Sequence, residues 1–122
     1  MKISCGTDII EISRVKEAIE RTGERFLHTV FTEKEIEYCE KRKNQKYQHY
    51  AARFAAKEAT FKALSNFIND GWHWTDFEVL KMESGRPEIH LKCNIDTLSN
   101  IDVSISHCKE YATANVVAIF ED

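Results

Sequence analysis

The sequence has no apolar stretch long enough to span a membrane, and it begins without a signal peptide. Its four cysteines are scattered and form no C-x-x-C pair. This argues against a zinc site and against a disulfide framework. We therefore expect a cytoplasmic protein with reduced thiols and no contact with membranes.

Several nucleotide- and metal-binding motifs are also missing. There is no G-x-x-x-x-G-K-[ST] loop and no G-x-G-x-x-G turn, which excludes ATP and dinucleotide sites of those types. The histidines have neither H-E-x-x-H nor H-x-H spacing, and no G-x-S-x-G hydrolase elbow is present. No repeat, low-complexity stretch or linker divides the 122 residues, which predicts a single domain over 1–122.

The net charge is only −3, but it is unevenly distributed. Residues 41–62 hold seven cations against one acid, whereas residues 94–122 carry a net charge of −4. The acidic total argues against a surface that binds nucleic acid. A local basic zone instead favours a discrete anionic ligand, with a solvated helix face as the equal alternative. Within the zone, Arg53 and Lys57 share one helix flank and are candidate phosphate binders.

Hydrophobic residues in the first half recur at helical spacing. After a short strand at 2–5, the predicted helices cover 12–22, 32–43 and 45–67. Gly23 is the expected stop of the first helix, and Thr32 with Glu35 is a capping-box signature for the second. The third should end at Asn69-Asp70-Gly71, and its many alanines allow another element to approach closely.

The second half changes to the alternating pattern of strands. The predicted strands cover 75–79, 89–93, 101–105 and 111–120. Apolar residues on both sides of the last strand predict a central position, and Trp72 and Trp74 are expected in the core or at a subunit contact. The fold class is therefore α+β, with N-terminal helices, including one long Ala-rich helix, packed on an antiparallel sheet.

Two carboxylates are candidate ligands for a hard cation. Asp8 follows the first strand, and Glu58 lies among cations in the long helix. Taken singly, each has a simpler explanation: Asp8 caps the first helix with Glu11 at N3, and Glu58 pairs with Lys62 at i,i+4. Taken together they favour a metal site, because Mg²⁺ is typically held by one or two carboxylates plus substrate phosphates.

Four motifs along the chain resemble those of the holo-[acyl-carrier-protein] synthase family, the small bacterial 4′-phosphopantetheinyl transferases. They are Gly6-x-Asp8 with Arg14, then Arg53-Phe54-Ala55-Ala56-Lys57-Glu58-Ala59 with Lys62, then Gly85-Arg86-Pro87, then Ser104-Ile105-Ser106-His107. They occur in the family's order and span nearly the whole chain. The Phe-Ala-Ala-Lys-Glu-Ala core combined with an upstream Gly-x-Asp is the specific part of the resemblance.

The resemblance implies an enzyme that moves 4′-phosphopantetheine from coenzyme A to a serine of apo acyl carrier protein and releases 3′,5′-ADP. It implies Mg²⁺ as the cofactor and a homotrimer with active sites at subunit interfaces. Coenzyme A is then the substrate and acyl carrier protein the partner, with no nucleic acid involved. Phosphoryl transfer is mainly positioning and charge neutralisation, a demand that the basic segment 41–62 fits.

Roles for single residues also follow from the resemblance. Asp8 and Glu58 would bind Mg²⁺, while Lys57 and Lys62 would hold the pyrophosphate. The nucleotide and its ribose phosphate would be met by Arg53, the Lys41–Lys46 cluster, Gly85, Arg86, Pro87, Ser106 and His107. The catalytic residues implied are Glu58, Lys62 and His107, with His107 near the phosphates or assisting deprotonation. The acidic carrier protein would be met by Arg14, Arg21 and Arg25.

The sequence departs from the family pattern at two places. Ser4 stands where the family usually has the first glycine of its N-terminal motif, and residues 64–68 lack the glycines that usually follow the motif lysine. The glycine-poor segment 64–68 supports one alternative, a non-catalytic module of the same fold that binds coenzyme A or carrier protein. A second alternative, a small RNA-binding domain, needs exposed aromatic residues beside cations on a sheet, whereas the cations here lie on predicted helices.

Overall fold

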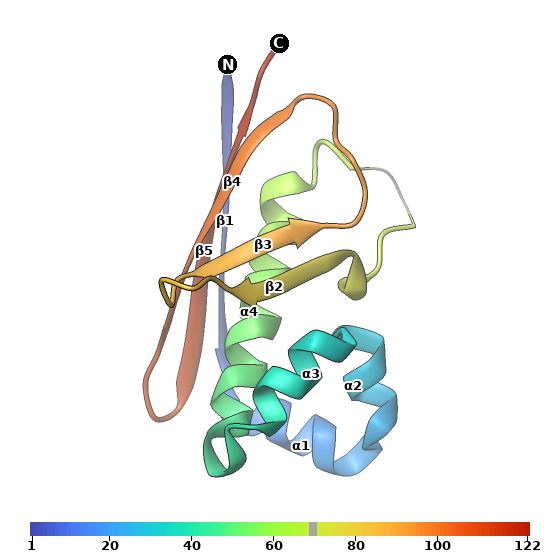
Figure 1. Cartoon of the computed structure of the whole chain (residues 1–122), viewed down its shortest axis with the longest axis vertical. Helices are drawn as coiled ribbons and strands as arrows, with labels where there is room; N and C mark the ends of the chain where they lie inside the picture. The colour runs from blue at the N-terminus through green and yellow to red at the C-terminus, as the bar shows by residue number, and fades with distance from the viewer. Residues whose placement is uncertain (69–70) are drawn as a thin grey trace.

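The computed structural model describes residues 1–68 and 71–122, in which a first strand is followed by a run of helices and then by the other strands (Figure 1). The elements are β1 (Lys2–Glu11), α1 (Ile12–Thr22), α2 (Glu24–Val30), α3 (Glu33–Glu40), η1 (Lys43–Gln45), α4 (Lys46–Leu64), η2 (Trp74–Asp76), β2 (Phe77–Lys81), β3 (Pro87–Leu91), β4 (Leu98–His107) and β5 (Tyr111–Phe120). The predicted α+β class is confirmed, with the helices before most of the strands.

The strands form two antiparallel sheets rather than one. The larger has the order β1-β5-β4, and the smaller pairs β2 with β3. The last strand is central in the larger sheet, as its two apolar faces predicted. Helix α4 runs along one face of this sheet, and α1, α2 and α3 gather around one end of α4 (Figure 1). None of the described helices covers the opposite face of the larger sheet (Figure 1).

Strand β1 lies directly against the backbone of α4. A Cβ atom added at Gly6 would lie 2.0 Å from the carbonyl oxygen of Ala59, so only glycine fits there. Ala55, Ala59 and Ala63 on the same helix are fully buried in this contact and its surroundings. The prediction that small residues on this helix allow close approach is confirmed.

One of the two explanations for Asp8 is wrong. Strand β1 does not stop at residue 5 but continues to Glu11, because its pairing with β5 runs on to Tyr111. Asp8 therefore lies within the strand, opposite Ala114, and does not cap a helix. The N-cap position of α1 is Glu11, whose side chain makes no capping hydrogen bond.

Local signals were more reliable at the helix ends. Thr32 and Glu35 form both hydrogen bonds of the predicted capping box, and the Gly23 N–H donates to Ile19 as a helix stop. Helices α3 and α4 are shorter than predicted, and the short helix α2 was not predicted. The Asn69 and Asp70 of the predicted helix stop lie outside the described residues.

Candidate active site

Asp8 and Glu58 reach one cavity from two elements far apart in the sequence. Asp8 follows Gly6 by two residues on β1, and Glu58 directly precedes Ala59 on α4, so the close backbone contact brings the two carboxylates together. They line the same cavity of about 360 Å³. Burial raises the pKa of Glu58, and the nearby Asp8 carboxylate raises it further.

Lys62 lies one turn beyond Glu58 on α4 but binds elsewhere. Its ammonium group donates to the Thr7 carbonyl oxygen at 2.9 Å and to Asp8 Oδ1 at 3.3 Å, and the side chain is about half exposed. Glu58 and Lys62, both described, form no ion pair with each other. The expected i,i+4 pair is therefore wrong, because Lys62 is drawn across to β1 and makes no direct contact with Glu58.

The two carboxylates fit a hard divalent cation. Holding two carboxylates together raises the pKa of one of them, and a cation between them would relieve that repulsion. Among the described residues no group of three or more His, Cys, Asp or Glu side chains gathers around a possible ion. Water, backbone or phosphate oxygens would complete the coordination, as is usual for Mg²⁺.

A second cavity, of about 260 Å³, lies toward the other end of α4 and is strongly cationic. Arg53 and His49 of α4, Lys81 of β2 and His107 of β4 all line it. Arg53 is buried, and its Nε has no hydrogen-bond partner among the residues that the structure describes. A buried, unpaired guanidinium nitrogen beside a cavity is the expected sign of a missing acceptor, such as a phosphate oxygen.

The ring of Tyr38, which lines this cavity, stacks against two guanidinium groups. Arg53 and Arg42 each place their guanidinium carbon 4.1 Å from the ring centroid. Burial alone would raise the pKa of the Tyr38 hydroxyl, but a bond to Arg42 and the charges of Arg42, Arg53 and Lys81 lower it overall.

The pKa of His49 is lowered in the same cationic surroundings. Burial, and then the charges of Arg53 and Arg42, lower the pKa of His49 to about 4. The imidazole is therefore neutral at pH 7, and the positive charge of the cavity comes from Arg53 and Lys81. The cavity is suited to an anion.

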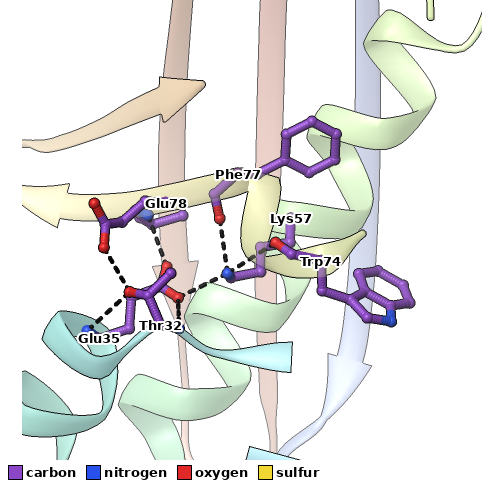
Figure 2. A network of polar contacts seen from close by, with 7 residues as sticks. Thr32, Glu35, Lys57, Trp74, Phe77 and Glu78 are labelled. Atoms are coloured by element: carbon purple, nitrogen blue, oxygen red, sulfur yellow. Dashed lines mark hydrogen bonds and ion pairs between the residues drawn. The ribbon is translucent and has the colours of Figure 1, made fainter. Parts of the chain in front are cut away.

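Lys57 does not have the role expected from the sequence. Its side chain is completely buried, and its ammonium group pairs with Glu35 at 2.7 Å and donates to the carbonyl oxygens of Trp74 and Phe77 at 3.1 and 2.7 Å (Figure 2). An ammonium group has three donors, and all three are used. The expectation that Lys57 holds the pyrophosphate therefore does not fit this structure. The side chain is closed off from any ligand, and its ammonium group has no free donor.

The other expected residues are spread over the molecule. Gly85 and Pro87 line the cationic cavity, but Arg86 does not: it pairs with Asp102 at 2.8 Å and lines a cavity on the outer face of the larger sheet. Ser106 is exposed on β4 and is not among the residues that line the cationic cavity.

Of the three expected partner-binding arginines, Arg14 lines the carboxylate cavity and pairs with Glu11 at 3.2 Å. Arg21 and Arg25 are exposed near the junction of α1 and α2. All three therefore remain accessible to a partner from the same end of the molecule.

Sequence reasoning missed Tyr38, His49 and Lys81 as cavity residues. His49 had a usable signal, since it precedes Arg53 by four residues and so shares its helix face. Tyr38 and Lys81 come from α3 and β2, and nothing local connects them with α4.

No helix among the described residues is long and apolar enough to cross a membrane. A model of the 4′-phosphopantetheinyl transferase superfamily matches residues 4–116. Among curated relatives, a holo-[acyl-carrier-protein] synthase of Ruminiclostridium cellulolyticum is 48% identical, covering 100% of this chain and 96% of the relative. One from Chlamydia pneumoniae is 47% identical over 96% of this chain and 97% of the relative.

Solved structures agree with the sequence matches. An ACPS–CoA complex described as from Chronobacterium ammoniagenes has a TM-score of 0.84 at 28% identity, with 100% of both chains covered. A holo-(acyl-carrier-protein) synthase from Bacillus anthracis, in complex with CoA (3′,5′-ADP), has a TM-score of 0.82 at 31% identity and covers 97% of this chain and 96% of the other.

Proposed function

The chain belongs to the 4′-phosphopantetheinyl transferase superfamily, and on that premise we propose that it transfers 4′-phosphopantetheine from coenzyme A to a serine of apo acyl carrier protein. One structural observation carries the proposal: helix α4 contributes Glu58 to the carboxylate cavity and Arg53 to the cationic cavity. Arg53 and Glu58 are five residues apart, about 7.5 Å along the helix axis. The two cavities therefore offer separate places for a diphosphate and for a ribose phosphate.

Asp8 and Glu58 are the residues that would hold Mg²⁺. When bound, the ion supplies positive charge to the oxygens of the pyrophosphate. Lys62, half exposed beside Asp8, would add a second positive charge on the same side. These residues orient the phosphorus that carries the pantetheine arm, and orientation is the larger part of catalysis in phosphoryl transfer.

The chemistry itself requires one proton acceptor. The serine oxygen of the carrier protein attacks the phosphorus, the bond from phosphorus to the 3′,5′-ADP oxygen breaks, and the serine proton must leave. We propose Glu58 as the acceptor on its position in the carboxylate cavity and not on its pKa, because a cation shared with Asp8 would offset the effect of the Asp8 charge. His107 lines the cationic cavity, where it would contact the nucleotide.

The cationic cavity would take the ribose phosphate of coenzyme A. The free Nε of Arg53 supplies a buried donor, and Lys81 adds an exposed positive charge. The neutral imidazole of His49 can donate one further hydrogen bond. Gly85 and Pro87 close the cavity from the turn between β2 and β3.

Arg14, Arg21 and Arg25 are the proposed contacts for an acidic carrier protein. Because Arg14 lines the carboxylate cavity, a partner held there would bring its serine close to Asp8 and Glu58. The free thiols of all four cysteines support a cytoplasmic location.

We also propose a homotrimer, assembled through the outer face of the larger sheet. Ile3, Ile9 and Val117 are exposed there, by 60%, 67% and 43%. Of the three surfaces that the sequence offers for assembly, the apolar last strand, β5, contributes Val117 to this face. The other two are less suitable: the alanine face of α4 is buried within the chain, and Trp72 and Trp74 pack against aromatic neighbours. Arg86, which lines the cavity on this outer face, would meet the neighbouring subunit.

Val117→Lys tests the assembly. It places a charge in the middle of the exposed apolar face and should shift the protein toward monomers in light scattering. A wild-type protein that is already monomeric at micromolar concentration would overturn the trimer.

The activity itself is tested with purified protein, apo carrier protein, coenzyme A and Mg²⁺, using mass spectrometry to detect the phosphopantetheine added to the carrier protein. Transfer without added Mg²⁺, in the presence of a chelator, would argue against the metal assignment. Binding of coenzyme A without any transfer would favour the non-catalytic alternative.

A further inference from the structure

The strongest feature outside the proposed site is the buried network around Lys57 and Glu35 (Figure 2). Both side chains are completely buried. Glu35 Oε1 accepts from the Thr32 N–H at 2.8 Å and pairs with Lys57 at 2.7 Å, while its Oε2 accepts from the Val79 N–H at 2.7 Å. With the Lys57 bonds to Trp74 and Phe77, the network joins α3, α4 and the η2–β2 segment.

Stability alone is a weak reason for such a pair. Removing two charges from water is costly, and a buried ion pair replaced by well-packed neutral side chains is often no less stable. What a buried pair with fixed hydrogen bonds can provide is a unique arrangement of the elements that it joins. The question is therefore what those elements build.

The three joined elements are the ones that form much of the cationic cavity. On α4, Arg53 precedes Lys57 by one turn, and on α3, Tyr38 follows Glu35 by one turn. The Arg53–Tyr38 stack, with 4.1 Å between the guanidinium carbon and the ring centroid, therefore lies one helical turn from the Lys57–Glu35 pair on the same two helices. Val79 connects the ion pair with the cavity, because its N–H donates to Glu35 and the residue also lines the cavity.

We propose that Glu35 and Lys57 are positioning residues that fix Arg53, Tyr38 and β2 relative to one another, and through them set the affinity of the cationic cavity for the nucleotide. Neither side chain touches the ligand. The proposal rests on the proposed function, because the nucleotide is the ligand assigned there. It differs from the role expected from the sequence, in which Lys57 held phosphate directly.

The test separates positioning from stability. In the double variant Glu35→Gln/Lys57→Met both charges are gone and the volumes are nearly kept, so folding should be regained relative to either single variant. A methionine side chain in place of Lys57 cannot donate to the carbonyl oxygens of Trp74 and Phe77, so β2 is no longer fixed to α4. We expect the double variant to unfold below the wild-type temperature but above either single variant, because the carbonyl oxygens of Trp74 and Phe77 lose their donor. It should bind 3′,5′-ADP about tenfold more weakly by titration calorimetry.

Kinetics gives a second readout. The KM for coenzyme A should rise in the double variant while kcat changes much less, because Asp8 and Glu58 lie on β1 and on a different flank of α4. Tyr50→Phe is the matched control: it removes a 2.6 Å hydrogen bond to Glu40 from another buried residue of α4. It should lower the unfolding temperature and leave the affinity for 3′,5′-ADP unchanged.

A double variant that folds and binds 3′,5′-ADP within twofold of the wild type would overturn the inference alone. A wild-type protein that does not bind 3′,5′-ADP would overturn the proposed function instead.

Amide hydrogen exchange on the wild type covers the case in which the variants do not fold. Coupling is reciprocal, so saturating 3′,5′-ADP should slow exchange at Val79 more than at Val116 of the central strand β5. Equal slowing at both residues would reject the coupling between network and cavity.

Discussion

Glu58→Gln should separate what the carboxylate does for activity from what it does to stability. The substitution keeps the size of the side chain and removes only its charge. Glu58 is partly buried beside Asp8, and Lys62 is bonded to β1 rather than to Glu58. The charge of Glu58 therefore has no direct partner in the protein without Mg²⁺.

The expected effects have opposite signs. Losing one of two metal ligands should remove about 3 kcal/mol of transition-state stabilisation, a fall in turnover of roughly 100-fold or more. Removing a destabilising charge should raise the free energy of unfolding by about 0.5–1 kcal/mol, comparable to other surface-charge improvements. For a chain of this length that corresponds to about 2–5 °C in the unfolding temperature.

The sign of the pH dependence follows from the raised pKa. A carboxyl group with a raised pKa in the folded state holds its proton longer there than in the unfolded chain. Its contribution to stability is therefore complete at low pH and is lost as the pH rises through the folded pKa. The stability gained by Glu58→Gln should be present at pH 7 and absent below about pH 4.

The assay is thermal unfolding in a chelator at pH 4 and pH 7, together with mass-spectrometric turnover across a series of Mg²⁺ concentrations. Asp8→Asn is the matched comparison, since it should lower turnover similarly but weakens the charge-assisted bond that Lys62 donates and so gives no stability gain. Glu58→Gln with wild-type turnover, or with lowered stability at pH 7, would refute the reasoning.

Three further outcomes are expected. Gly6→Ala should destabilise the protein by about 3 kcal/mol or more in denaturant unfolding, since its Cβ would overlap the Ala59 carbonyl oxygen; a loss below about 1 kcal/mol would contradict the close contact. Arg14→Glu combined with Arg21→Glu should slow carrier-protein modification most at low salt and leave coenzyme A binding nearly intact, and wild-type rates at low salt would show that α1 is not the docking surface. His49 should show no NMR titration between about pH 5.5 and 8 in the free protein, because burial and neighbouring cations lower its pKa to about 4. Bound 3′,5′-ADP should raise that pKa. An ordinary titration of His49 near pH 6.5 in the free protein would argue against a cationic cavity.

The sequence was sufficient where the signal was local. The capping box of Thr32 and Glu35 was predicted because both of its hydrogen bonds span only three residues. The end of β1 was not predicted, because the pairing of Glu11 with Tyr111 depends on a strand a hundred residues away. A carboxylate that follows a glycine then looks like a helix cap although it lies within a strand.

Lys57 shows the same limit at the candidate site. Its helix flank, shared with Arg53, was evident from the spacing, but spacing does not say whether a flank faces solvent or another element. Burial of an ammonium group requires a carboxylate from elsewhere, and Glu35 already had a sufficient local explanation as a capping residue. One side chain serves both purposes, and only the packed structure reveals the second.

The contact between Gly6 and Ala59 has a consequence for how such enzymes diverge. The separation of the two carboxylates depends on backbone atoms in contact, with no layer of side chains between them. Substitutions accumulating in the rest of the core can change its volume without changing that separation, provided that the glycine and the alanine persist. Selection on specificity can then act on the surface helices and loops while the reaction geometry is inherited unchanged.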